Sequence, residues 1–161
     1  MSTVASPPEQ HIAVAIRNQL DGAVDEVRVS RKDRMSVVAR KETVREAAEL
    51  LKRFGFDHAI SVSGVDWPDE NKIEVLYFVS SYTRDDLKRI VISLRAKTDR
   101  EDSRLPSLTP VWSSVDLFER EVYEMFGVSS DGHPNLTKLL LQDNWDGPPP
   151  LRKDLKIPEM G

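Results

Sequence analysis

The sequence predicts an α+β fold in which a mostly antiparallel sheet carries helices on one face, followed by a helix and a long extended C-terminal tail. Apolar residues recur at helical spacing in some segments, β-branched residues alternate in others, and the late part of the chain has no sustained period. The resulting order of helix, two strands, helix and three strands is typical of α+β domains. We therefore assign residues 1–95 to an α+β domain.

The first elements are a helix and a hairpin. The apolar residues between Glu9 and Leu20 favour a short helix. Two β-branched runs follow, Val24–Ser30 and Met35–Ala39, and the polar stretch Arg31–Arg34 between them predicts a turn. These two runs are therefore expected to pair as a hairpin.

A second helix is expected at Lys41–Phe54, where apolar side chains repeat at helical spacing. Thr43 and Glu46 have the spacing of a capping box, in which two side chains satisfy free amides at the helix start. Gly55 suits the left-handed conformation that follows the last turn of many helices.

Three further strands complete the predicted domain. They are expected at His58–Val65, Lys72–Val79 and Leu87–Leu94, which are rich in β-branched and aromatic residues. After Arg95 the chain becomes charged and then proline-punctuated, so residues 96–110 are interpreted as a connection.

The composition excludes several classes of function. The chain has 161 residues and a formal net charge of −4, so it lacks the overall basic character that neutralises nucleic-acid phosphates. It contains no cysteine, which excludes disulfides, cysteine nucleophiles and iron–sulfur clusters held by cysteine. No apolar run reaches about 18 residues, so contact with a membrane is expected through other chains.

Residues 111–127 predict an amphipathic helix, Val111–Phe126, closed by Gly127. Ser113 or Ser114 can cap its start. An apolar stripe runs along one side of this helix and consists of Val115, Phe118, Val122, Met125 and Phe126.

The charged residues of this helix raise the question of catalysis. Glu119 and Glu121 lie two positions apart, so their carboxylates diverge and cannot act across one bond as a catalytic pair. We expect them at the two borders of the apolar stripe, where each would seek an arginine or a backbone amide. Arg120 is expected on the far side, flanked by Asp116 and Glu124. A solvated helix face remains the alternative interpretation.

The tail, residues 128–161, has little periodic pattern and contains several prolines. Its large apolar residues are too numerous for a solvated tail, so we expect it to lie on another surface. These residues are Leu139, Leu140, Leu141, Trp145 and Ile157.

Three blocks in this part of the chain resemble one known family. They are FEREVYEMFG (118–127), DGHPNLTKLLL (131–141) and NWDGPPPLRKD (144–154). In this order they are similar to the signature of the thirty-kilodalton subunit of respiratory complex I, the proton-translocating NADH:quinone oxidoreductase. The preceding LPSLTPVW (105–112) resembles the family's entry to the helix. The chain departs from the family pattern at Thr137, where a basic residue is usual, and at Pro148–Pro150, where a second Gly-His-Pro is common.

The resemblance implies a non-catalytic structural subunit of an oxidoreductase complex. Such a subunit lies in the hydrophilic arm and braces the large quinone-site subunit and the neighbouring iron–sulfur subunits. It carries no cofactor, because the iron–sulfur clusters, flavin and quinone belong to the partner subunits. Its place would be the cytoplasmic side of a prokaryotic cell membrane, held there by partners, with the thylakoid membrane as the alternative.

Two functional alternatives remain open at this point. Related subunits serve complexes that use ferredoxin, reduced deazaflavin or hydrogen, and nothing in this chain identifies the electron donor. A more distant alternative is a stand-alone hydrolase that uses the carboxylate of Glu119 or Glu121.

The resemblance also indicates which residues bind partners or anchor the tail. His133 could instead be a turn histidine bonded to a nearby carbonyl oxygen. The charged cluster Arg152–Asp154 could instead be a solvated surface. For Glu119 to Glu121, contact with a partner subunit and contact within this chain are equally favoured. The predicted partner-binding residues are Glu119, Arg120, Glu121, His133, Pro134, Trp145, Arg152, Lys153 and Asp154.

Overall fold

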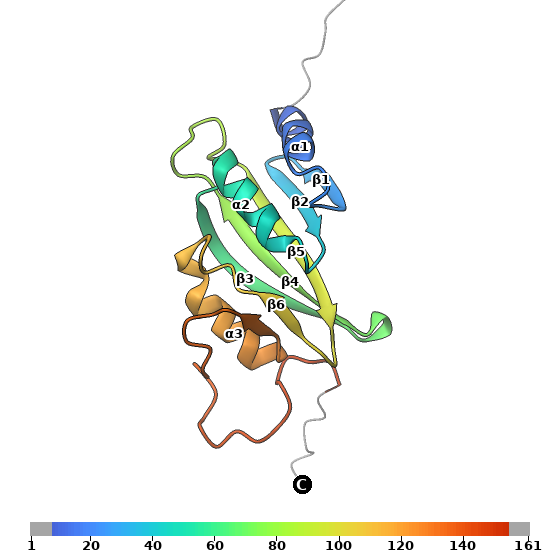
Figure 1. The fold of residues 1–161 in the computed structure, drawn as a ribbon, viewed down its shortest axis with the longest axis vertical. Helices are drawn as coiled ribbons and strands as arrows, with labels where there is room; N and C mark the ends of the chain where they lie inside the picture. Colours follow the sequence, from blue (N-terminus) through green and yellow to red (C-terminus); the bar gives the residue numbers. More distant parts are fainter. Residues whose placement is uncertain (1–7, 155–161) are drawn as a thin grey trace, which may run out of the picture.

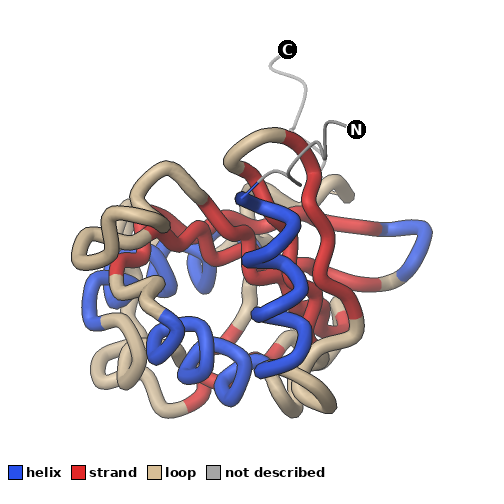
Figure 2. The backbone as a smooth tube through the Cα atoms, turned by 90° about the horizontal axis from the view of Figure 1, so that it is seen from above, coloured by secondary structure: helices blue, strands red, loops and turns tan. Residues whose placement is uncertain are grey.

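The computed structural model describes residues 8–154, so residues 1–7 and the end of the predicted tail, residues 155–161 with Ile157, lie outside the described part. A five-stranded sheet in the order β1-β2-β5-β4-β3 forms the centre of the molecule (Figure 1). Its three helices lie on one face of the sheet, and Figure 2 shows this layering from above. The predicted α+β class is therefore confirmed.

The helices and strands follow one another along the chain as expected for most of its length. The helices are α1 (Pro8–Gln19), α2 (Val44–Phe54) and α3 (Asp116–Phe126), and the strands are β1 (Glu26–Arg31), β2 (Arg34–Ala39), β3 (His58–Trp67), β4 (Lys72–Ser80), β5 (Val91–Asp99), β6 (Arg104–Pro106) and β7 (Ser129–Asp131). Short 3-10 turns cover Pro68–Glu70 and Ser113–Val115.

The sheet is mostly antiparallel. The pairs β1–β2, β3–β4 and β4–β5 are antiparallel, and the pair β2–β5 is parallel. The hairpin β1–β2 confirms the turn expected from the polar residues between two β-branched runs. One face of this sheet packs with α2 and α3 into the hydrophobic core.

The start of α2 differs from the prediction. Thr43 does not cap the helix, because its hydroxyl donates to the carbonyl oxygen of Arg40 at 3.4 Å instead of accepting from a helix amide. The predicted capping box with Glu46 was therefore wrong. Gly55 does follow the last turn with a positive φ of 131°, and its N–H bonds to carbonyl oxygens of that turn.

The strand predicted at Leu87–Leu94 was misplaced. It begins at Val91 and extends to Asp99, into the segment interpreted as a connection. Leu87 and Ile90 are buried in a turn, so their spacing reflects burial and not strand alternation. The charged end of β5 is compatible with a strand because Lys97 faces away from the core. Its ammonium pairs with the carboxylate of Glu70, in the 3-10 turn after β3.

A second, small sheet was missed. Strands β6 and β7 pair in parallel, with Arg104 opposite Ser129 and Leu105 opposite Ser130. Each strand has three residues, which is too short for a periodic signal. This pairing fixes the chain on both sides of α3.

The helix α3 begins later than predicted and is not capped by a serine. Ser114 lies in the preceding 3-10 turn and donates its hydroxyl to the carbonyl oxygen of Ala59 at 3.2 Å. At the other end Gly127 adopts the left-handed conformation, with φ 74°, as expected. No helix within residues 8–154 combines the length and apolar character needed to cross a membrane.

Close contact between α3 and β3 depends on Gly64. A Cβ atom at this position would lie 2.6 Å from the ring of Phe126. Because that separation is shorter than van der Waals contact, any larger residue would push the end of α3 away from the sheet.

Candidate partner interface

Glu119 lies inside the protein, between α3 and the sheet, with 1% of its surface exposed. Its Oε1 accepts hydrogen bonds from the Tyr77 hydroxyl at 2.8 Å and from the Leu108 N–H at 2.7 Å. Its Oε2 accepts a hydrogen bond from the Ser107 hydroxyl at 2.6 Å. Three donors therefore satisfy this buried carboxylate and tie the approach to α3 onto the helix.

The tyrosine that donates to Glu119 is held in its protonated form. Burial raises the pKa of Tyr77 well above its usual value, and the charge of Glu119 and their shared hydrogen bond raise it further. Tyr77 therefore stays a hydrogen-bond donor over the physiological pH range.

Glu124, on the following turn of α3, binds the backbone of the C-terminal segment. Its Oε1 accepts hydrogen bonds from the N–H groups of Leu139 at 3.1 Å and Leu141 at 2.6 Å, and its Oε2 accepts one from Leu140 at 2.8 Å. Burial alone would raise the pKa of this carboxyl, but the three amides together with Lys138 lower it below its ordinary value.

Arg120 holds the residues just before this contact. Its Nε donates to the Thr137 carbonyl oxygen at 3.1 Å, and its Nη2 donates to the Thr137 hydroxyl at 3.0 Å and the Lys138 carbonyl oxygen at 3.1 Å. Asp116 and Glu124 lie one helical turn to either side of Arg120, as expected, but among the described residues neither forms an ion pair with it. The arginine and Glu124 instead bind the backbone of residues 137–141. We call residues 137–141 the anchored segment.

His133 has the geometry of a turn histidine. Its Nδ1 accepts a hydrogen bond from the Asn135 N–H at 3.0 Å, so in the neutral ring the proton lies on Nε2. Nε2 is 3.0 Å from the carbonyl oxygen of Asp116 and 3.1 Å from one of its carboxylate oxygens. The ring is fully covered, whereas the neighbouring Pro134 is exposed.

Arg152 fastens the chain to the end of α3. Its Nε donates to the carbonyl oxygen of Phe126 at 2.7 Å, and its Nη2 donates to the Ser103 hydroxyl at 3.3 Å. A Cβ at Gly127 would lie 2.9 Å from Cγ of Pro149 and 3.0 Å from this guanidinium. Glycine is therefore required here both for its backbone conformation and for the space it leaves.

The next two residues bind Asp66 near the end of β3 and Arg100 just after β5. The N–H of Lys153 donates to Oδ2 of Asp66 at 2.8 Å, and Asp154 lies 2.9 Å from Nη2 of Arg100. Arg100 also pairs with the buried Asp66, with 2.8 Å between Nε and Oδ1. The ammonium of Lys153 lies 5.7 Å from the centre of the Trp67 ring.

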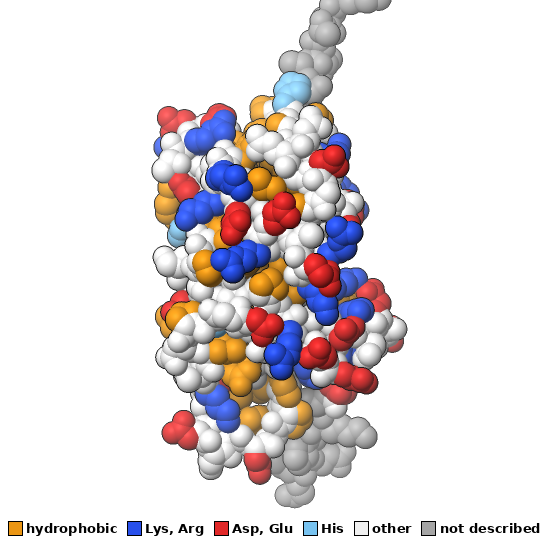
Figure 3. All heavy atoms as spheres, in the orientation of Figure 1, with side chains coloured by type: hydrophobic (Ala, Val, Ile, Leu, Met, Phe, Trp, Pro, Cys, Tyr) orange, Lys and Arg blue, Asp and Glu red, His pale blue; other side chains and the backbone are white. Residues whose placement is uncertain are grey.

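Large hydrophobic side chains remain exposed around this anchored chain. Leu140 is 63% exposed, Leu151 is 54% exposed, and Leu139 and Trp145 are more than one third exposed. In Figure 3 hydrophobic side chains gather on the lower part of the visible face, where α3 and the C-terminal segment lie. Exposed apolar surface next to a fixed backbone is typical of a protein–protein interface.

Sequence reasoning missed the residues that receive the C-terminal segment. Asp66 and Arg100 come from β3 and from the turn after β5, so no local spacing connects them with that segment. Tyr77 of β4, which binds Glu119, was missed for the same reason. Ser107 lies within residues 105–112, which resemble the family's entry to the helix. Of the predicted residues, Glu121 makes no hydrogen bond or ion pair within the described part of the chain and is exposed.

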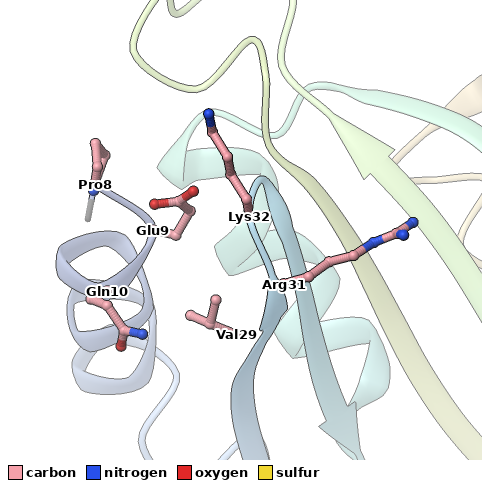
Figure 4. Close-up of a pocket in the computed structure, with 6 residues that line it drawn as sticks. All are labelled: Pro8, Glu9, Gln10, Val29, Arg31 and Lys32. Atoms are coloured by element: carbon pink, nitrogen blue, oxygen red, sulfur yellow. The ribbon is translucent and has the colours of Figure 1, made fainter. Parts of the chain in front are cut away.

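Metal-ligating side chains and pockets are the features of the described part of the chain that could hold a cofactor. Within residues 8–154 no group of three or more His, Asp and Glu side chains is arranged to hold a metal ion. A pocket lined by Glu9, Val29 and Lys32, among others, lies between α1 and the β1–β2 hairpin, away from α3 (Figures 1 and 4). Its lining includes none of the predicted partner-binding residues.

Comparison with known proteins gives one consistent family. The model of the family "Respiratory-chain NADH dehydrogenase, 30 Kd subunit" matches residues 37–160. A subunit of the F(420)H(2) dehydrogenase of Methanosarcina mazei is 33% identical over 144 residues, which is 89% of each chain. A subunit of the NADH-quinone oxidoreductase of Salinispora arenicola is 38% identical over 140 residues, which is 84% of this chain and 55% of that protein. The chain thus spans about half the length of this second relative.

Two solved structures share the fold. One is a chain of the membrane-bound sulfane sulfur reductase, an archaeal respiratory membrane complex, with a TM-score of 0.80 and 22% identity over 92% of this chain and 86% of that one. The other is a trypsin-resistant fragment of Nqo5, with a TM-score of 0.66 and 26% identity over 80% of this chain and 99% of that one.

Proposed function

Because the chain belongs to the family of the 30 kDa subunit of respiratory-chain NADH dehydrogenase, we propose that it is a structural, cofactor-free subunit of such a complex. In this role it lies in the hydrophilic arm of a proton-translocating NADH:quinone oxidoreductase. It braces the large quinone-site subunit and the neighbouring iron–sulfur subunits and performs none of the bond-making itself.

The observation that carries this proposal is the way α3 holds the C-terminal segment. Arg120 binds carbonyl oxygens of the anchored segment, and Glu124 binds three successive amides. The polar backbone is thereby satisfied within the chain, while Leu139 and Leu140 remain exposed. An extended segment with a fixed backbone and free apolar side chains is suited to packing against another protein.

Fixing the segment in advance has an energetic consequence for assembly. A disordered segment loses conformational entropy when a partner orders it, and this loss subtracts from the binding free energy. Here Arg152 and Glu124 order residues 137–152 before any partner binds. The subunit can therefore hold its neighbours at a defined spacing, which electron transfer and a quinone pocket require.

The absence of cysteine supports the proposed location of the iron–sulfur clusters in partner subunits. The sequence has no cysteine, so it supplies no thiolate for an iron–sulfur cluster. In the proposed complex the clusters, the flavin and the quinone are bound by partner subunits. The chain reaches the membrane through those partners, on the cytoplasmic side of a prokaryotic cell membrane or, alternatively, at a thylakoid membrane.

A second candidate differs in the electron donor. The relative from Methanosarcina mazei is named a subunit of an F(420)H(2) dehydrogenase and matches over nearly its full length. This favours an equivalent structural role in a complex that oxidises reduced deazaflavin as the alternative to NADH. Assaying the purified complex with each donor in turn separates the two candidates.

The hydrolase alternative receives no support from the geometry. Both oxygens of Glu119 accept hydrogen bonds from the chain itself, and the side chain is buried. A substrate cannot reach this carboxylate without opening the core. Glu121 is exposed, and within residues 8–154 no second carboxylate lines the groove beside it.

Affinity purification tests the proposal. The tagged full chain, expressed in its native host and isolated under gentle conditions, is expected to bring down iron–sulfur and membrane subunits together with quinone reductase activity. The free chain should show neither redox activity nor hydrolase activity. Recovery as a monomer with no such partners, or turnover by the free chain, would contradict the proposal.

A further inference from the structure

Strand β3 lies at the outer edge of the five-stranded sheet and, within the described residues, pairs with β4 alone. The free edge of such a strand presents backbone N–H and C=O groups that another extended chain can bind in series. The free run is Ser61–Val65. At one end of this run the Ser114 hydroxyl already donates to the carbonyl oxygen of Ala59, next to a β-bulge. At the other end the carboxylate of Asp66 already accepts a hydrogen bond from the Lys153 N–H.

A groove runs between this edge and α3. It has a volume of ≈ 160 Å³, and Val62, Val122 and Phe126 contribute to its apolar lining. Leu151 lies at one end and is 54% exposed. Because side chains of a strand alternate between the two faces, every second residue of an added strand would enter this groove.

Glu121 gives the groove its charge. It lines the same groove, is exposed, and makes no hydrogen bond or ion pair with any other residue that the structure describes. The neighbouring acidic residues differ, because Glu119 and Glu124 are both satisfied by donors of this chain. An unpaired carboxylate beside an apolar groove favours a ligand that brings a lysine or arginine.

We propose that the edge of β3 and this groove bind an extended segment of a neighbouring subunit, which adds as a strand of about five residues opposite Ser61–Val65. The residue opposite Val62 is basic and pairs with Glu121. The residue two positions away, opposite Gly64, is apolar and packs between Met125 and Leu151. This inference rests on the proposed subunit role and specifies the chemistry of one partner contact.

The charge argues against a second copy of this chain as the occupant. Pairing of two β3 edges about a two-fold axis would bring the two Glu121 side chains to the same interface, where like charges repel. The chain as a whole also has a net charge of −4, which disfavours self-association and favours a partner segment with basic residues.

Charge reversal in the assembled complex tests the proposal. The variant Glu121→Lys is expected to lower the yield of complex that co-purifies with the tagged chain by about ten-fold, because it places a cation opposite the partner's cation. The matched control is Glu46→Lys, because Glu46 is an exposed glutamate on α2 that makes no side-chain hydrogen bond or ion pair among residues 8–154. It lies in the first turn of its helix, so the substitution costs that helix more than Glu121→Lys costs α3. If free Glu121→Lys is at least as stable to heat as free Glu46→Lys, a loss of assembly in Glu121→Lys alone is not due to misfolding.

A photoreactive amino acid at position 63, with position 28 on the opposite edge as control, identifies the occupant. We expect position 63 in the complex to cross-link to a partner segment with a basic and an apolar residue two positions apart. Exchanging that basic residue for glutamate should restore assembly of Glu121→Lys.

Three results would overturn the inference: no cross-link from position 63 in a complex that assembles, a cross-link to a second copy of this chain, or normal assembly of Glu121→Lys. Each of these leaves the subunit role intact, because the unmodified chain still co-purifies with its partners. Failure of the unmodified chain to co-purify would instead remove the subunit role.

Discussion

Glu124 is an acidic side chain that is 5% exposed and whose partners are backbone amides of the anchored segment. Folding lowers the pKa of this carboxyl below its ordinary value of 4.5. Its contribution to stability is therefore present above pH about 4.5 and is lost as the pH falls through the folded-state pKa.

We predict that the variant Glu124→Ala releases the anchored segment while the sheet stays folded. Amide hydrogen exchange at Leu139–Leu141 should accelerate by at least about ten-fold, because the hydrogen bonds to a charged acceptor are lost. In the unmodified protein the same amides should lose protection on acidification below pH about 4.5, after correction for the intrinsic exchange rate. Unchanged protection in both experiments would refute the anchoring role of this carboxylate.

The buried pair of Tyr77 and Glu119 leads to a prediction on stability. The variant Tyr77→Phe removes one donor from a buried carboxylate and should lower the free energy of unfolding by about 1–3 kcal/mol, measured by urea denaturation. Tyr82→Phe is the matched control, because Tyr82 is 67% exposed and stacks on His58 through its ring.

The pH dependence of the same pair has a defined sign. Folding raises the pKa of Tyr77, so its contribution to stability is complete below the unfolded-state value of about 10 and is lost as the pH rises above it. Tyr77→Phe should therefore flatten the fall in stability at alkaline pH. If the unmodified protein and Tyr77→Phe lose the same amount of stability at alkaline pH, Tyr77 is not the cause of that loss.

At the scale of elements, the contact between α3 and β3 positions the whole C-terminal segment. Because a Cβ at Gly64 would lie 2.6 Å from the Phe126 ring, Gly64→Ala should destabilise the protein by about 1–3 kcal/mol. The neighbouring exposed Ser63→Ala serves as control and should change the stability by less than about 0.5 kcal/mol. Chemical denaturation measures the change in unfolding free energy of each variant. Equal changes for Gly64→Ala and Ser63→Ala would argue against close packing between Gly64 and Phe126.

The sequence predicted the larger elements because their signals are local. Helix α2 and the hairpin β1–β2 follow from apolar spacing and polar turns within about fifteen residues. The start of β5 was misplaced because Leu87 and Ile90 are buried without being in a strand. Strands β6 and β7 exist through pairing across α3, which no short window contains.

The candidate site was predictable in part for the same reason. The charged residues of α3 stood out as a pattern, but the predicted partner-binding residues left out Glu124, which binds the amides of residues 139–141. The residues that receive the tail did not stand out, because Asp66 and Arg100 meet Lys153 and Asp154 only after the chain has folded. The division of the three glutamates of α3 into two buried and one exposed also depends on the positions of Ser107 and the anchored segment.

At the scale of the whole molecule, the sheet and its helices form a rigid support for the C-terminal segment. The segment is fastened by Arg120 and Glu124 in its middle and by Arg152 near its end. Large apolar side chains between these points remain exposed. This arrangement supports the proposed role, in which the subunit sets the position of its neighbours.

The most direct measurement of this claim separates the amount of complex from its activity. In the variant Arg152→Ala the segment loses its side-chain hydrogen bonds to Phe126 and Ser103, so the yield of assembled complex should fall several-fold. The Michaelis constant for quinone and the turnover per assembled particle should remain at the values of the unmodified complex. A complex that assembles in normal amount but has an altered Michaelis constant would contradict the account.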